Sequence, residues 1–214
     1  NNPLLKPVKQ KGTVGIIPYY QIKGKTYVFL GQELPGGKKE AAATFSDFGG
    51  SMNPDGKTVL AHALREFKEE TMRQIHLSDD DVLKNGYLLY KKTDKGRGIY
   101  YIFVKFSEKQ YNKANKIHVA KVRLKASSAP NSHLEKESFA WMSLDDLMQQ
   151  AVPAPVAKPE DTSAQEPITP VVTEQQRFAV HTPDGETMSI LVRGYFLQDC
   201  LQHPDMPALV KQLK

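Results

Sequence analysis

Three glutamates within five positions have the residue type and the spacing that a bound metal ion requires. Glu66 and Glu70 lie four positions apart, and Glu69 lies three positions after Glu66. On a helix all three carboxylates therefore share one face, where like charges destabilise the helix by a few tenths of a kcal/mol per pair. A hard divalent cation such as Mg²⁺ or Mn²⁺ binds carboxylate oxygens and would relieve this repulsion. The alternative interpretation is an ordinary acidic helix face in solvent.

The stretch around these glutamates has the periodicity of a helix. Apolar residues recur every three or four positions, which predicts one buried stripe on a helix from about Thr58 to Gln74. The stripe consists of Leu60, Ala63, Leu64, Phe67 and Thr71. Thr58 or Asp55 is a suitable N-cap. Arg65 lies four positions before Glu69, where it can orient that carboxylate.

Strand-forming runs lie on both sides of this helix in the chain. Runs rich in β-branched and aromatic residues predict strands at 12–20, 25–32, 87–92, 99–106, 117–124 and 139–142. A short turn joins 12–20 to 25–32, and another joins 87–92 to 99–106. Each pair is typical of a hairpin. A short helix is predicted at 143–148, directly after the last of these strands.

The C-terminal part of the chain differs in composition from the rest. Residues 152–170 hold five of the 14 prolines between polar residues, a composition typical of an extended linker. Beyond it, 177–180 and 187–192 flank a Pro-Asp-Gly turn and predict a hairpin, followed by helices at about 195–203 and 207–214. Segments of about forty residues rarely form a stable domain alone. We therefore expect a main domain at 1–150, a linker or long loop at 151–170, and a C-terminal hairpin and helix at 171–214 that pack on the main domain.

Together, these residues resemble the Nudix hydrolase family, whose box has the pattern G-x5-E-x7-R-E-U-x-E-E-x-G-U, with U a bulky aliphatic residue. Gly50 matches the first glycine, and the run Arg65-Glu66-Phe67-Lys68-Glu69-Glu70 matches in register. The resemblance covers roughly residues 10–150 and includes a tryptophan-containing strand that enters a helix. It implies an α/β fold: a Nudix-like α/β/α sandwich with a mixed sheet, to which the C-terminal hairpin and helix are added.

The chain departs from the family's pattern at three places. The loop after Gly50 is one residue longer, Lys57 occupies the place of an acidic residue, and Met72 replaces the final glycine. In the family, that acidic residue braces the arginine that corresponds to Arg65. Arg65 is therefore expected to face a like charge or to find another partner. None of these changes removes a carboxylate from the box.

The resemblance also implies a set of site residues. The metal ligands are the Gly50 carbonyl and the carboxylates of Glu66, Glu69 and Glu70. Arg65 belongs to the same catalytic group. The family often adds a carboxylate from a loop before the tryptophan-containing strand, where Glu135 and Glu137 lie. Either of them is a candidate metal ligand or a base for the attacking water; the alternative is a solvated Lys/Glu loop.

Basic residues are concentrated in one segment. The formal net charge is +5, and residues 91–126 hold eleven lysine and arginine residues against two acids. Such a segment suggests an anionic partner, namely a phosphate, a polyphosphate or a nucleic acid; the alternative is a solvated lysine-rich hairpin. The side chains predicted to bind the substrate are Lys91, Lys92, Arg97 and Tyr90.

The composition disfavours several classes of protein. No apolar stretch approaches the ~20 residues that span a bilayer, so no membrane partner is expected. Cys200 is the only cysteine and forms no internal disulfide, which excludes a disulfide scaffold and fits a reducing compartment. We expect a cytoplasmic protein, and an N-terminus that is incomplete because Asn1 is not an initiator methionine.

The resemblance implies a function: divalent-metal-dependent hydrolysis of a nucleoside diphosphate linked to another group. Mg²⁺ or Mn²⁺ would neutralise phosphate charge and lower the pKa of the attacking water. ADP-ribose or a nucleotide sugar is favoured by family frequency; dinucleoside polyphosphates, capped RNA and inositol pyrophosphates are the alternatives. A second hypothesis is a Nudix-like module of impaired activity that binds a nucleotide, a nucleic acid or a protein, since Lys57 and the longer loop alter the box.

Overall fold

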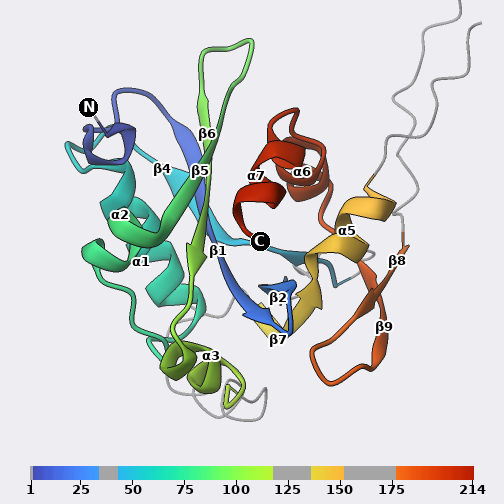
Figure 1. The fold of residues 1–214 in the computed structure, drawn as a ribbon. Helices are drawn as coiled ribbons and strands as arrows, with labels where there is room; N and C mark the ends of the chain where they lie inside the picture. Colours follow the sequence, from blue (N-terminus) through green and yellow to red (C-terminus); the bar gives the residue numbers. More distant parts are fainter. Residues whose placement is uncertain (1, 34–42, 118–135, 152–176) are drawn as a thin grey trace, which may run out of the picture.

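The computed structural model describes residues 2–33, 43–117, 136–151 and 177–214. Within them, helices cover both faces of a seven-stranded sheet, and the C-terminal hairpin forms a second, two-stranded sheet (Figure 1). The large sheet has the strand order β3-β2-β1-β6-β5, with β4 also paired to β1 and β7 to β2. It is mixed because β1 and β6 run parallel, whereas the other pairs are antiparallel. The expected α/β/α sandwich with a mixed sheet is confirmed.

The strand predictions are largely confirmed. The strands of the large sheet are β1 (Gly12–Ile22), β2 (Lys25–Glu33), β3 (Phe45–Ser46), β4 (Phe48–Met52), β5 (Gly86–Lys92), β6 (Gly98–Lys105) and β7 (Lys136–Ser143). Both predicted hairpins form, β1 with β2 and β5 with β6. The predicted strand at 117–124 lies outside the described residues from position 118 onward, as does the linker from position 152.

Two hydrophobic cores lie against the sheet. Because successive side chains of a strand point to opposite faces, β1 sends Val14 and Ile16 into one core and Ile17 and Tyr19 into the other. The first core is covered by α1 (Val59–Glu70), α2 (Asp79–Asn85) and α3 (Glu108–Ala114). The second is covered by α5 (Leu144–Gln150) and the C-terminal segment. Figure 1 shows these two groups of helices on opposite sides of the sheet.

Helix α1 begins where predicted but ends four residues earlier than predicted. The Thr58 hydroxyl accepts a hydrogen bond from the Ala61 N–H (3.1 Å), which satisfies one unpaired donor of the first turn. At the other end, Met72 and Arg73 have φ values of 52° and 59°, in the left-handed region that terminates a helix. Met72 stands where the resemblance places a glycine, the residue that adopts this conformation without strain.

Two short helices, α2 and α3, were not predicted. Each is specified by a capping box, in which the N-cap serine and the residue three positions later bond to each other's backbone N–H: Ser78 with Asp81, and Ser107 with Gln110. Seven residues are too few to show a helical period. The capping pattern was therefore the available signal. No helix in the described part of the chain is long and apolar enough to cross a membrane.

The C-terminal segment contributes to the second core. Its elements are β8 (Arg177–His181), β9 (Thr187–Leu191), α6 (Gly194–Phe196), a π-helical turn at Leu197–Leu201 and α7 (Met206–Gln212). Phe178 and Phe196 are fully buried in the same core as Ile17 and Val28 of the large sheet. The Arg193 N–H also donates to the carbonyl of Phe45 in β3 (3.0 Å). This segment is therefore placed to supply residues to a site on the sheet.

Candidate functional site

A cleft of about 740 Å³ lies over β1, β4 and β6. Its walls are completed by Glu66 of α1, by the β5–β6 turn and by the segment around α6. The charged side chains that line it are Lys11, Asp47, Glu66, Arg97, Arg193 and Asp199. Tyr100 of β6 and Tyr195 of α6 add aromatic surface, and Tyr195 is 71% exposed. The cleft therefore combines a glycine-rich floor, charges and aromatic rings.

The glutamate helix contacts this cleft through Glu66. A Cβ atom at position 50 would lie 2.5 Å from Glu66 Oε1, so the absence of a side chain at Gly50 lets the carboxylate reach the backbone of β4. Arg65 bonds to Glu66 through one nitrogen and to Glu69 through the other, at 2.9 Å. Lys57 pairs with Asp55 (3.3 Å). Arg65 therefore pairs with carboxylates of its own helix, which agrees with the expectation that it finds another partner.

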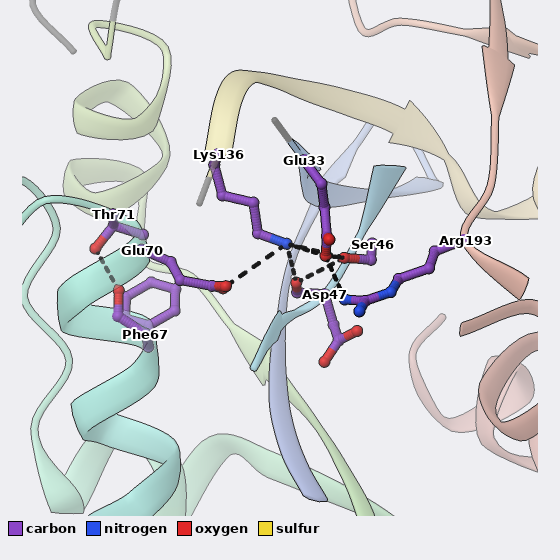
Figure 2. A network of polar contacts seen from close by, with 8 residues as sticks. All are labelled: Glu33, Ser46, Asp47, Phe67, Glu70, Thr71, Lys136 and Arg193. Atoms are coloured by element: carbon purple, nitrogen blue, oxygen red, sulfur yellow. Dashed lines mark hydrogen bonds and ion pairs between the residues drawn. The ribbon is translucent and has the colours of Figure 1, made fainter. Parts of the chain in front are cut away.

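Glu70 faces a different cation. Its side chain is 4% exposed, and Glu70 Oε1 lies 3.7 Å from Nζ of Lys136, whose side chain is 1% exposed. The Lys136 ammonium group also donates to Ser46 Oγ (2.8 Å), the Asp47 main-chain oxygen (2.9 Å) and Glu33 Oε1 (3.1 Å). Figure 2 shows Lys136 reaching from β7 into the space between Glu70 and these residues. We call these five residues the Lys136 network.

A β-bulge aims Lys136 at α1. Strand β7 pairs with β2 as Gln32 with Ser138 and then Glu33 with Lys136, so the register shifts by one residue of β7 at this point. The extra residue turns Lys136 to the face of Phe48, whose ring centroid lies 5.9 Å from Nζ. Gly31 leaves room for the lysine stem, because a Cβ there would lie 2.7 Å from Lys136 Cδ.

These positions bear on the metal that the resemblance implies. Glu66 and Glu69 bond to Arg65, while Glu70 lies against Lys136. Within residues 2–33, 43–117, 136–151 and 177–214, no three histidine, cysteine, aspartate or glutamate side chains are grouped so as to hold a metal ion. The arrangement of these three carboxylates therefore does not fit a divalent ion, and the ligand set stays a prediction.

Two further acids of the Lys136 network have altered ionisation. Burial of Glu33 opposes its ionisation, but the cations Lys136 and Arg193 outweigh it and hold the pKa of this carboxyl below its usual value. Asp47 lines the cleft beside Gly15, and burial raises its pKa to about 6, although Lys136 and Arg193 pull it back. Asp47 therefore takes up a proton at a pH where most aspartates are ionised.

The raised pKa of Asp47 predicts a pH dependence of stability. The unfolded chain loses this proton near pH 3.8 and the folded chain near 6, so the folded state binds more protons between these values. The contribution of Asp47 to stability is present below the unfolded pKa and is lost as the pH rises through the folded pKa. We expect the Asp47→Asn variant to gain stability relative to wild type from pH 4 to pH 6, in urea denaturation at each pH. A difference that is constant across this range would contradict the assignment.

The predicted substrate-binding residues are placed differently from one another. Arg97 lines the cleft, whereas Lys91, Lys92 and Tyr90 do not. Lys91 bonds to Asp199 (2.6 Å), and the Tyr90 ring lies against Tyr100 with centroids 4.8 Å apart. Of the two carboxylates that were predicted in a loop before the tryptophan-containing strand, Glu137 lies in β7 and Glu135 lies outside the described residues.

Several residues of the site were missed from the sequence. They are Lys11, Glu33, Asp47, Lys136, Arg193 and Tyr195. Lys136 stands between two glutamates and had the pattern of a solvated loop. Arg193 and Tyr195 belong to a segment whose position on the sheet no local pattern specifies. Asp47 gave a weak signal, since it is a lone charge between two phenylalanines that precede a double glycine.

No protein-family model matches this sequence, and neither does any curated protein sequence. Among solved structures, a C. elegans Ap4A hydrolase binary complex is similar at 19% identity, over 64% of this chain and 83% of that one, with a TM-score of 0.36. The NUDIX domain of Shewanella oneidensis NrtR complexed with ADP ribose is similar at 13% identity, over 66% and 78%, with a TM-score of 0.38. A T. brucei MERS1–RNA complex is similar at 13% identity, over 66% and 54%, with a TM-score of 0.42. At these identities and TM-scores, the likenesses carry no information on what the cleft of this chain binds.

Proposed function

We propose that this protein binds a phosphate-bearing nucleotide in the cleft. The observation that carries the proposal is the imbalance between the cleft's cations and its acids. Glu66 is paired with Arg65 and Asp199 with Lys91, and burial raises the pKa of Asp47 to about 6, which favours its neutral form. By contrast, Lys11 and Arg97 are exposed and have no carboxylate within 4 Å among the described residues.

The side chains that line the cleft suggest how a nucleotide would bind in it. Lys11 and Arg97 are suited to phosphate oxygens, and arginine binds them through two parallel N–H bonds. The exposed Tyr195 ring offers a surface on which a base can stack, an interaction that tolerates every base. The backbone of Gly49 and Gly50 lines the floor of the cleft, beside the carboxylates of Asp47 and Glu66.

Metal-dependent hydrolysis of a nucleoside diphosphate derivative is a second candidate function. It is favoured by the close approach of the Glu66 carboxylate to Gly50, the two residues to which the family resemblance gives metal-binding roles. Arg65 would first have to release Glu66 and Glu69, so that these carboxylates could hold Mg²⁺, which would supply charge neutralisation and an activated water. The pairing of Arg65 with both Glu66 and Glu69 favours metal-independent binding over hydrolysis.

The test is equilibrium binding of a panel of fluorescent nucleotides, including ADP, ADP-ribose and a dinucleoside polyphosphate, in EDTA and in Mg²⁺. We expect binding in both buffers. Arg97→Gln should weaken it about tenfold or more, since a hydrogen bond to a charged group is worth roughly 1.5–3 kcal/mol. Tyr195→Ala should weaken it by a comparable factor, because base–aromatic stacking is worth about 1–3 kcal/mol.

Arg177→Gln is the matched control, because Arg177 is an exposed arginine of β8 that does not line the cleft. An equal loss of affinity in Arg177→Gln would indicate non-specific attraction and contradict the assignment of the cleft. Phosphate release from the same panel, measured in Mg²⁺, would instead favour the second candidate.

A further inference from the structure

The oxygen atoms around Lys136 are those that a hard metal ion uses in proteins. Two carboxylates, a hydroxyl and a main-chain carbonyl surround Nζ, and they come from β2, β3, α1 and the residue after β3. Mg²⁺ and Ca²⁺ take the same kinds of donor. A buried ammonium group is tolerated only when such partners compensate its lost hydration. The set is therefore a cation site, and the cation in it is a side chain.

The contact distances and the charge of the group distinguish an ammonium group from a divalent metal ion at this place. The contacts from Nζ to Ser46, Asp47 and Glu33 are 2.8–3.1 Å, the lengths of hydrogen bonds from an ammonium group. Mg²⁺ binds oxygen at about 2.0–2.1 Å and requires near-octahedral geometry. A divalent ion at Glu70 would also lie within a few ångströms of a like charge in a buried, poorly screened place. The two cations therefore exclude each other.

We infer that Lys136 takes the place of a divalent cation beside Glu70, so that ligand binding in the cleft needs no metal ion. The statement about ligand binding rests on the proposed nucleotide binding, whereas the cation replacement does not. The same lysine connects α1 to the cleft, since it bonds to the Asp47 carbonyl and to Glu33, and Glu33 also pairs with Arg193 (Figure 2). The fixed ammonium group of Lys136 thus connects α1, β2 and the residue after β3, with no need for a removable metal ion.

The test is Mn²⁺ binding, followed by electron paramagnetic resonance and by thermal melting. Wild type should bind no Mn²⁺ specifically and should keep its melting temperature in about 1 mM Mn²⁺. Lys136→Met removes the ammonium and keeps the length of the side chain. It should bind Mn²⁺ at least about tenfold more tightly than wild type and melt at a higher temperature when Mn²⁺ is added. The double variant Lys136→Met/Glu70→Gln should lose the gained affinity, and Lys211→Met, at an exposed lysine of α7, should behave as wild type.

Two results would overturn the inference. One is specific Mn²⁺ binding by wild type that disappears in Glu70→Gln, since the metal would then already have its place. The other is a folded Lys136→Met protein that gains no Mn²⁺ affinity. If Lys136→Met does not fold, the comparison of wild type with Glu70→Gln decides: absence of specific Mn²⁺ binding in both supports the inference.

Nucleotide binding is measured in a separate experiment. Equal affinity of wild type for nucleotide in EDTA and in Mg²⁺ supports the metal-independent site. Failure to bind any nucleotide would overturn the proposed function and leave the cation replacement to be judged by Mn²⁺ alone.

Discussion

Lys136→Met is expected to lower the free energy of unfolding by about 3–5 kcal/mol, the usual effect of removing one partner from a buried ion pair. The methionine fills the space of the lysine stem over Gly31 but leaves the buried Glu70 and the half-buried Glu33 without this ammonium group. Chemical denaturation at neutral pH in EDTA measures the effect. EDTA is needed so that trace metal does not replace the lost charge.

A double-mutant cycle separates the ion pair from the packing of the side chain. Glu70→Gln alone and Lys136→Met alone should each destabilise the protein, and the double variant should be more stable than the sum of the two effects predicts. Lys211→Met serves again as the control, because substitutions at exposed sites are usually within about 0.5 kcal/mol of wild type. Strict additivity of the two changes would show that Lys136 and Glu70 do not interact.

The fold was predictable from the sequence where the periodicity is strong. The β1–β2 and β5–β6 hairpins and the start of α1 follow from alternating runs and from the Thr58 cap. The end of α1 was missed because its last turn is closed by positive φ values at Met72 and Arg73, which neither side chain favours. The helices α2 and α3 were missed because they are shorter than the window in which a period can be recognised.

The site was predictable only in part, for a different reason. The helical spacing of Glu66, Glu69 and Glu70 places them correctly on one helix, and Arg65 of the same helix pairs with the first two, but the cation beside Glu70 comes from elsewhere in the chain. Lys136 lies 66 positions after Glu70, and a bulge reverses the face to which it points. A single-residue change of register moves a side chain to the other face of a sheet. Residue type and local pattern therefore do not reveal such a contact.

Lys57 shows how a departure from a motif can be harmless to the helix. From the sequence, a lysine in the acidic place suggested repulsion with Arg65. In the structure, Lys57 is exposed and pairs with Asp55, whereas Arg65 turns to the carboxylates of its own helix. The positive charge of Lys57 is thus paired within the loop, by Asp55. The guanidinium of Arg65 pairs with Glu66 and Glu69 and not with a residue at position 57.

Phe196→Ala is expected to destabilise the protein by about 3–5 kcal/mol and also to weaken nucleotide binding, because this residue belongs to both the core and the cleft. Its ring is 1% exposed and packs edge-on against Tyr101 with centroids 6.1 Å apart, and it lines the cleft next to Tyr195. Tyr195→Ala is the matched neighbour: its ring is 71% exposed, so stability should change by no more than about 0.5 kcal/mol while affinity falls. Denaturation and nucleotide titration of the two variants measure both quantities. If Phe196→Ala left stability unchanged, the C-terminal segment would not be packed on the sheet; if Tyr195→Ala left affinity unchanged, the segment would be a structural support and not a wall of the binding site.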